Sequence, residues 1–147
     1  MQKFTTSVFI NRSQQDVFDF LSDPAHLPKW DSDFESAEWT SSGVPGIGSR
    51  YQASGKRLGS EKDGFFEIVQ WDRPNRYSYK VTERMFLFEQ AETIFTLKPK
   101  DNGTEVTFES QFEIVSRLKF AEGFVARMGK KRIEGNLNAA KHLMEAG

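Results

Sequence analysis

The sequence predicts an α+β fold in which one long C-terminal helix packs against an antiparallel sheet. Residues 116–147 contain no proline, are rich in good helix formers, and repeat apolar residues every three or four positions. Most of residues 34–114 instead alternate apolar and polar side chains, which is typical of half-buried strands. Because the helix and the sheet each have an apolar face to bury, we expect them to share one core.

One strand and two helices precede the sheet. Residues 3–11 alternate and are rich in β-branched and aromatic side chains, which predicts a strand. Ser13 begins the first helix, because Ser-Gln-Gln-Asp resembles a capping box. Asp23 and Pro24 begin the second helix, as its N-cap and first helical residue. We expect Pro28 to keep this helix short.

Six further strands follow, separated by segments with the residues of turns. The turns are predicted at residues 41–46, 72–75 and 99–103, which are rich in Gly, Pro, Asn, Asp and Ser. The expected strands are residues 34–40, 48–55, 64–72, 76–83, 85–98 and 104–115. Residues 56–63 are polar and fit either a turn or the start of a strand. The predicted order is β-α-α-β6-α, and the lack of linkers and repeats predicts a single domain over residues 1–147.

The composition limits the function. The 20 basic and 21 acidic residues leave a formal net charge of -1, so we expect no nucleic-acid partner. Cysteine is absent, which excludes disulfides, thiolate metal sites and a cysteine nucleophile. No apolar run resembles a signal peptide or a membrane span, so we expect a cytoplasmic protein without integral membrane association. The oligomeric state is left open between monomer and homodimer.

The motifs of metal and nucleotide chemistry are incomplete. His26 and His142 lie far apart and lack the spacing of a zinc site. The segment Asp31-Ser32-Asp33 begins like a calcium loop but lacks its glycine and its final glutamate. Gly43, Gly46 and Gly48 do not form a phosphate-binding loop. We therefore expect neither a metal nor another cofactor.

Four segments resemble a known family. They are DVFDFLSDPAHLPKW (residues 16–30), GIGSRY (46–51), WDRPNRYSY (71–79) and NGTEVTF (102–108). In this order and spacing, the chain resembles the START/Bet v 1-like (SRPBCC) superfamily, and most closely its polyketide cyclase/dehydrase and lipid-transport branch. The resemblance covers the whole chain and is more specific for fold than for activity.

This resemblance implies a helix-grip fold, in which a curved antiparallel sheet wraps around the C-terminal helix and encloses a cavity. It also implies binding or transport of a small hydrophobic ligand, such as a lipid, a quinone or a polyketide-like molecule. One alternative is a cyclase/dehydratase-type enzyme that uses acid/base residues in the cavity. Another is a START-like interaction module without a ligand. The fold alone does not decide between these functions.

Rings and polar groups that share a strand face are the candidate ligand contacts. If Phe95 faces inward, the two-residue period also carries Glu89 inward, where burial would favour its neutral, proton-donating form. In the enzymatic alternative, Glu89 is the acid/base and Tyr79 the orienting hydrogen-bond donor. Arg50 is a possible counter-ion for Glu89 or for an acidic ligand. A bulge between residues 85 and 93 would reverse this register and turn Glu89 outward, which is the alternative. The expected ligand contacts are Arg50, Tyr51, Tyr77, Tyr79, Glu89, Phe95, Phe108, Phe112, Phe120, Phe124 and Met128.

Two apolar stripes on the terminal helix predict a kink or break near Gly129. The stripe of residues 133–144 is rotated by roughly a third of a turn from that of residues 118–128, and the segment contains Gly123, Gly129 and Gly135. We expect the second half to seal the core and the first half to border the cavity. The basic run at residues 130–132 could contact a phospholipid surface, although such a run is more often a solvated face.

Overall fold

The computed structural model describes residues 1–57, 60–83 and 87–147. Its elements follow the predicted β-α-α-β6-α order, with short 3-10 segments (η1, η2) beside the helices. The first residues of the strand expected at 85–98, and residues 58–59 of the polar segment, lie outside the described residues. The elements are β1 (Gln2–Ile10), α1 (Gln14–Ser22), η1 (Pro24–His26), α2 (Leu27–Trp30), β2 (Ser36–Trp39), β3 (Arg50–Arg57), β4 (Ser60–Asp72), β5 (Arg76–Val81), β6 (Phe88–Lys100), β7 (Gly103–Ile114), η2 (Ser116–Ala121) and α3 (Glu122–Ala146).

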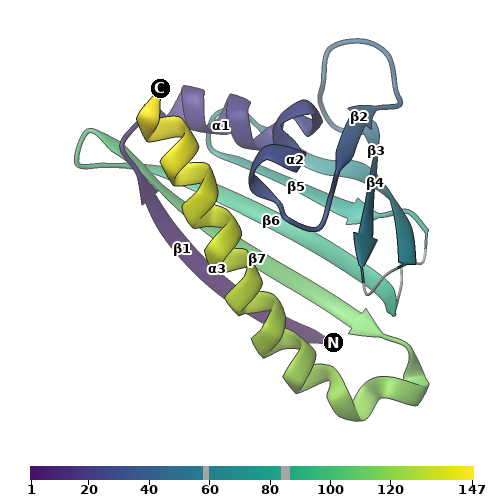
Figure 1. Ribbon diagram of the computed structural model, residues 1–147. Coiled ribbons are helices and arrows are strands. Elements are labelled where there is room, and N and C mark those ends of the chain that lie inside the picture. Colours follow the sequence, from purple (N-terminus) through teal and green to yellow (C-terminus); the bar gives the residue numbers. More distant parts are fainter. Residues whose placement is uncertain (58–59, 84–86) are drawn as a thin grey trace.

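The seven strands form one antiparallel sheet in the order β1-β7-β6-β5-β4-β3-β2. Strands β2 to β7 pair with their neighbours in sequence, and β1 joins the sheet beside β7. The sheet curves around α3, which runs diagonally across it over β1 and β7 (Figure 1). Helices α1 and α2 lie beside α3, on the side away from β1. The predicted helix-grip fold is confirmed.

The helix starts follow the predicted capping residues. The Ser13 side chain accepts a hydrogen bond from the backbone N–H of Asp16 (3.2 Å), and the Asp23 carboxylate accepts one from Ala25 (2.9 Å). These bonds satisfy donors that the first turn of a helix leaves without a partner. The short polar segment between α1 and α2 is thereby fixed, and it positions the loop that follows α2.

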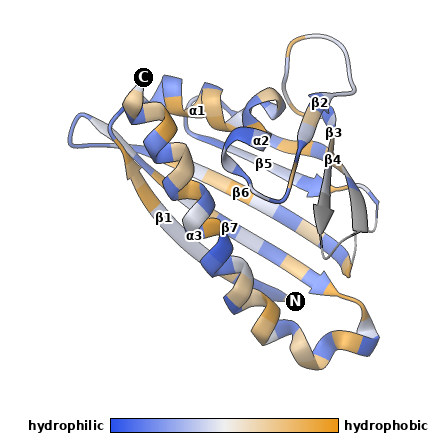
Figure 2. Ribbon diagram, in the orientation of Figure 1, coloured by the Kyte–Doolittle hydropathy of each residue, from blue (hydrophilic) through white to orange (hydrophobic). Residues whose placement is uncertain are grey.

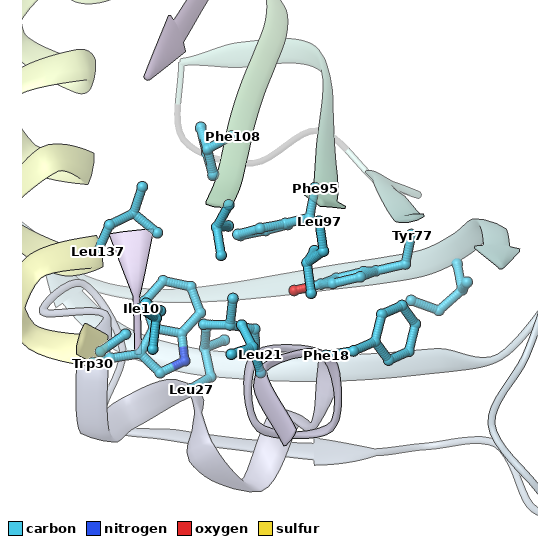
Figure 3. Close-up of a cluster of buried hydrophobic side chains, with 14 of the residues drawn as sticks. Ile10, Phe18, Leu21, Leu27, Trp30, Tyr77, Phe95, Leu97, Phe108 and Leu137 are labelled. Carbon is cyan, nitrogen blue, oxygen red and sulfur yellow. The ribbon is translucent and has the colours of Figure 1, made fainter. Parts of the chain in front are cut away.

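The main core lies between the sheet, α1, α2 and the second half of α3. Strands β6 and β7 alternate hydrophobic and hydrophilic residues, so each has one face for this core (Figure 2). Side chains from strands and helices meet there (Figure 3). Its fully buried members include Ile10, Val17, Phe18, Ile68, Phe95, Leu97, Val106, Leu137 and Ala140. Because this core fills one end of the space under α3, the other end remains for a cavity.

The predicted break at Gly129 is wrong, because α3 is continuous from Glu122 to Ala146. The irregular segment lies earlier, at η2. The inward stripe is also continuous, but in the first half it includes the small residues Ala126 and Gly129, while Phe124 and Met128 are exposed. In this half of α3, Ala126 and Gly129 differ from the exposed Phe124 and Met128 in their smaller size rather than in greater hydrophobicity. The stripe is Glu122, Ala126, Gly129, Ile133, Leu137 and Ala140. Among the described residues, no helix is long and apolar enough to cross a membrane.

Candidate ligand-binding cavity

A cavity of about 150 Å³ lies between the sheet and the first half of α3. Its walls are mostly apolar, and six phenylalanines from four strands and one loop contribute rings to them. On the helix side, Val125, Gly129 and Ile133 face the cavity. The cavity is partly open to solvent, and a mainly apolar space of this volume is large enough for one small aromatic molecule. The six phenylalanines are Phe4, Phe34, Phe66, Phe88, Phe108 and Phe112.

Gly129 sets how closely α3 approaches β1. A Cβ atom added to Gly129 would lie 3.2 Å from Cε2 of Phe4, closer than ordinary van der Waals contact. The absence of a side chain at residue 129 therefore lets the backbone of α3 lie close to the Phe4 ring without displacing it. The same glycine keeps this part of the cavity wall free of a side chain.

Stacked rings form the wall of the cavity on strands β3, β4 and β5. Tyr51 stacks on Phe66 with 4.8 Å between ring centroids. Tyr79 packs edge-on against both, at 5.7 Å from Tyr51 and 5.6 Å from Phe66. These are favoured geometries for aromatic pairs. The three rings hold one another in place, so the two phenolic hydroxyls have defined positions at the cavity.

The polar end of the cavity is built by the loop between α2 and β2. The Asp31 carboxylate accepts hydrogen bonds from the backbone N–H of Asp33 (2.9 Å) and from the side-chain amide of Asn136 on α3 (3.3 Å). Asp33 forms an ion pair with Arg132 of α3 (2.9 Å). Asp31, Asp33 and Arg132 all line the cavity. The loop is thus tied to α3, and it places two carboxylates and a guanidinium beside the apolar walls.

The tyrosines at this site remain protonated well above neutral pH. Burial is the largest cause that raises the pKa of Tyr51 and Tyr79, and the nearby Asp31 carboxylate raises both further. Hydrogen bonding with Thr93 and Tyr51 opposes the rise for Tyr79 without cancelling it. The cavity wall therefore holds protonated phenols, which hydrogen-bond with each other and with Thr93, near the Asp31 carboxylate.

A second, much smaller void lies behind the tyrosine wall. Its volume is about 10 Å³, which is close to the space of one water molecule. Trp30 and Tyr77 both border it, and neither the indole N–H nor the Tyr77 hydroxyl has a hydrogen-bond partner in the described part of the chain. Trp30 also lines the main cavity. Its indole nitrogen is fully buried and has no hydrogen-bond partner among the described residues.

The structure brings some of the predicted ligand contacts together. Tyr51, Tyr79, Phe108 and Phe112 all line the cavity. Tyr77 and Phe95 do not, because Phe95 is fully buried and the two rings stack at 4.8 Å within the core. They border only the small void.

Glu89 and Arg50 do not face the cavity, so their predicted roles are corrected. The ladder between β6 and β7 pairs Phe88 with Ile114 and then Gln90 with Glu113. Glu89 is therefore the extra residue of a β-bulge, and its side chain is exposed. Arg50 is also exposed and forms an ion pair with Glu67 of the neighbouring strand (2.9 Å). It lies on the opposite face of β3 from Tyr51.

Phe120, Phe124 and Met128 do not border the cavity either. Their side chains are 87%, 58% and 49% exposed, on the outer side of η2 and α3. Their expected position is wrong because Val125, Ala126 and Gly129 form the inner face of this half of the helix.

The sequence analysis missed several residues of the site. Phe66 lies opposite Tyr51 in the ladder between β3 and β4, so pairing the two strands would have found it. Phe4 lies six positions before Ile10, on the same face of β1, and alternation would have found it. Asp31, Asp33 and Arg132 lie in a loop and on a helix, where no periodic signal shows that they meet.

A curved sheet around a long helix, with an apolar cavity between them, defines a protein with the helix-grip fold. The chain belongs to the family described as polyketide cyclase/dehydrase and lipid transport, whose match covers residues 1–145. None of the curated proteins matches the sequence.

Solved structures with the same fold share little sequence with this chain. The protein TTHA0849 from Thermus thermophilus is 18% identical, with a TM-score of 0.81 over 99% of this chain and 98% of its own. A START superfamily protein from Mycobacterium smegmatis is 12% identical, with a TM-score of 0.82 over 98% and 97%. The di-domain ARO/CYC protein BexL from the BE-7585A biosynthetic pathway is 14% identical, with a TM-score of 0.81 over 99% of this chain and 47% of BexL. At these identities the likeness shows the fold alone.

Proposed function

We propose that this protein binds and carries a small aromatic molecule with one hydroxyl or carbonyl group in the cavity under α3. The observation that supports this most is the composition of the walls, in which six phenylalanine rings surround a polar end with Asp31, Tyr51 and Tyr79. Apolar walls favour the body of such a ligand through burial, and the few polar groups favour one orientation.

The size of the cavity restricts the ligand. A volume of about 150 Å³ suits one or two fused rings and is below the range of about 300–1,000 Å³ that is usual for drug-sized ligands. A long acyl chain or a full-length polyketide would extend beyond this space. We therefore favour a compact ring compound over a lipid with long chains.

Binding can be measured with two matched probes, naphthalene and 1-naphthol, which differ by one hydroxyl. Both should raise the thermal unfolding temperature, because a ligand that binds only the folded state stabilises it. 1-Naphthol should bind more tightly, by roughly tenfold for one hydrogen bond to a buried charged group. Native mass spectrometry of the freshly purified protein should in addition reveal a co-purified ring compound.

Variants of cavity residues and of a neighbouring surface residue distinguish binding of the probes in the cavity from binding elsewhere on the protein. Tyr79→Phe and Asp31→Asn should reduce the preference for 1-naphthol while naphthalene still binds. Val125→Phe should fill the cavity and weaken both probes, whereas Phe124→Ser, one position away and facing outward, should change neither. The proposal is wrong if no probe binds the wild-type protein, or if Val125→Phe folds and binds both probes normally.

A cyclase/dehydratase activity is a second candidate, supported by the short distance in the fold between a carboxylate and two protonated phenols. Asp31 would accept a proton from a carbon beside one carbonyl group, and the enolate carbon so formed would bond to the second carbonyl carbon of the same molecule. Tyr79 would donate a hydrogen bond to the oxygen of that second carbonyl, and the proton held by Asp31 would pass to this oxygen to give a hydroxyl group. Glu89, which is exposed, has no part in this version. Under this candidate, Asp31→Asn should abolish cyclisation of an aromatic diketone at unchanged affinity, and Glu89→Gln should leave the rate unchanged.

Cytoplasmic localisation, the single-domain assignment and a monomeric or homodimeric state stay predictions.

A further inference from the structure

The outer side of η2 and the first half of α3 carries large apolar side chains in contact with solvent. Phe120, Phe124 and Met128 follow one another at intervals of four residues. Phe124 and Met128 lie four apart on α3 and therefore on the same side of that helix, and Phe120 lies just before them on η2. We call these three exposed residues the outer stripe. Their exposed fractions of 87%, 58% and 49% are high for side chains of this size. Figure 2 shows that hydrophobic residues are frequent along η2 and the first half of α3.

Positive charge is concentrated around the outer stripe. Residues 116–132 hold six basic residues and a single acid, Glu122, which is buried. The whole chain has 20 basic and 21 acidic residues, so 14 basic and 20 acidic residues remain elsewhere. The formal charge is therefore +5 in this segment and -6 in the rest of the chain. The six basic residues are Arg117, Lys119, Arg127, Lys130, Lys131 and Arg132.

Most of these charges are available to an external partner. Lys119 pairs with Glu113 (3.0 Å), and Arg132 pairs with Asp33 (2.9 Å). Arg117, Arg127, Lys130 and Lys131 are exposed, and no carboxylate of the described residues forms an ion pair with them. The surface thus combines exposed rings with cations that have no internal partner among the described residues.

We propose that the outer stripe and its basic flanks dock this protein onto the surface of an anionic lipid bilayer. Phenylalanine side chains can enter the boundary between headgroups and acyl chains, while lysine and arginine contact anionic headgroups. A second copy of the chain fits this surface poorly, because a twofold interface would place two segments of charge +5 against each other. Three apolar side chains are also few for a stable dimer interface.

The proposal does not depend on the identity of the cavity ligand. In this proposal, α3 contributes both to the cavity wall and to the membrane-binding surface, because Val125 and Gly129 face the cavity while Phe124 and Met128 face outward. Docking by the outer stripe would hold the cavity wall next to the bilayer.

The test is flotation with two kinds of vesicle, one of phosphatidylcholine alone and one in which a quarter of the lipid is phosphatidylglycerol. The protein should float with the anionic vesicles at low salt and should bind the phosphatidylcholine vesicles at least about tenfold more weakly. High salt should weaken the binding, because it screens charges at the surface. Equal binding to both vesicles, or binding to neither, overturns the proposal.

Substitutions on this surface should separate the contribution of the positive charges to membrane binding from that of the apolar side chains. The double variant Lys130→Gln/Lys131→Gln should lose about 25-fold in affinity, which is about fivefold for each charge. Phe124→Ser/Met128→Ser should lose about tenfold or more through the buried apolar area. The controls are Lys29→Gln/Lys98→Gln, at exposed positions elsewhere, and Leu143→Ser, on the far half of α3, which should change affinity by less than about threefold.

Light scattering after gel filtration tests whether a second copy of the chain, rather than a bilayer, covers this surface. The proposal is overturned if the protein is a dimer that Phe124→Ser/Met128→Ser converts to a monomer, since the outer stripe would then be an interface between two copies. It is also overturned if the controls lose as much affinity as the surface variants. All of these residues are exposed, and circular dichroism should show unchanged folding for each variant.

Discussion

At the scale of single residues, glycines of α3 have different roles although the sequence makes them look alike. Around Gly135 nothing lies within 4 Å of an added Cβ atom, whereas at Gly129 the Phe4 ring lies 3.2 Å away. Gly135 is therefore a replaceable position in a helix, and Gly129 is a packing position between α3 and β1.

Gly135→Ala should increase the free energy of unfolding by about 0.5–1 kcal/mol, because alanine is the better helix former. Gly129→Ala should bring less than this gain, or a loss, because Phe4 has to move away from the new methyl group. Urea denaturation of both variants provides the comparison. An equal gain for both would mean that α3 does not approach β1 as closely as described.

Glu122 shows how a buried charge can be accommodated at a helix start. Its carboxylate accepts a hydrogen bond from the backbone N–H of Ile114 (3.1 Å) and lies 3.8 Å from the Lys119 ammonium. A negative charge in the first turn also interacts favourably with the helix dipole. These contacts fix the start of α3 to the end of β7.

Glu122→Ala should lower the free energy of unfolding by about 1–3 kcal/mol, because the Ile114 N–H would be left without its partner. The matched control is Glu134→Ala, at an exposed position of the same helix, where a change within about 0.5 kcal/mol is expected. Urea denaturation measures both variants. A loss at Glu134 as large as the loss at Glu122 would show that removing any carboxylate from α3, rather than the buried contact of Glu122, is responsible.

At the scale of elements, the sequence predicted which segments are strands and helices but not all of their inner faces. Order, caps and turns are local properties, and these predictions are confirmed. The face of β6 near Glu89 depends on a bulge, which requires knowing how β6 pairs with β7. The inner face of α3 depends on how close the helix lies to β1, because close approach selects Ala126 and Gly129 over Phe124.

For the cavity, rings on strands were easier to predict than the polar residues. Tyr51 and Phe108 follow from alternation along a strand. Asp31 meets the cavity because the loop after α2 is tied to Asn136 of α3, a contact between residues far apart in sequence. A single sequence contains no periodic pattern that would indicate such a contact.

At the scale of the whole molecule, all three tyrosines of the chain should respond together to alkaline pH. Tyr51, Tyr77 and Tyr79 have pKa values raised above the ordinary value of 10.0, mainly by burial. In the unfolded chain they lose their protons near pH 10, whereas in the folded protein they keep them. Stability is therefore fully retained below pH 10 and falls as the pH rises further.

The expected slope is about 4 kcal/mol per pH unit, once all three tyrosines are ionised in the unfolded chain and none in the folded protein. Tyr79→Phe should reduce this slope by about one third. Tyrosinate absorbance and urea denaturation followed between neutral and alkaline pH measure the two effects. Titration of the folded protein near pH 10 would contradict the burial of these side chains.

The cavity has a last consequence for the response of the protein to hydrostatic pressure. A space of about 150 Å³ corresponds to about 90 mL/mol, and part of this volume disappears when the chain unfolds. Pressure should therefore unfold the ligand-free protein readily. A molecule that fills the space, such as 1-naphthol, should move the midpoint to higher pressure, which fluorescence in a pressure cell can follow. The cavity that accommodates a ligand thus also makes the ligand-free fold less stable under pressure.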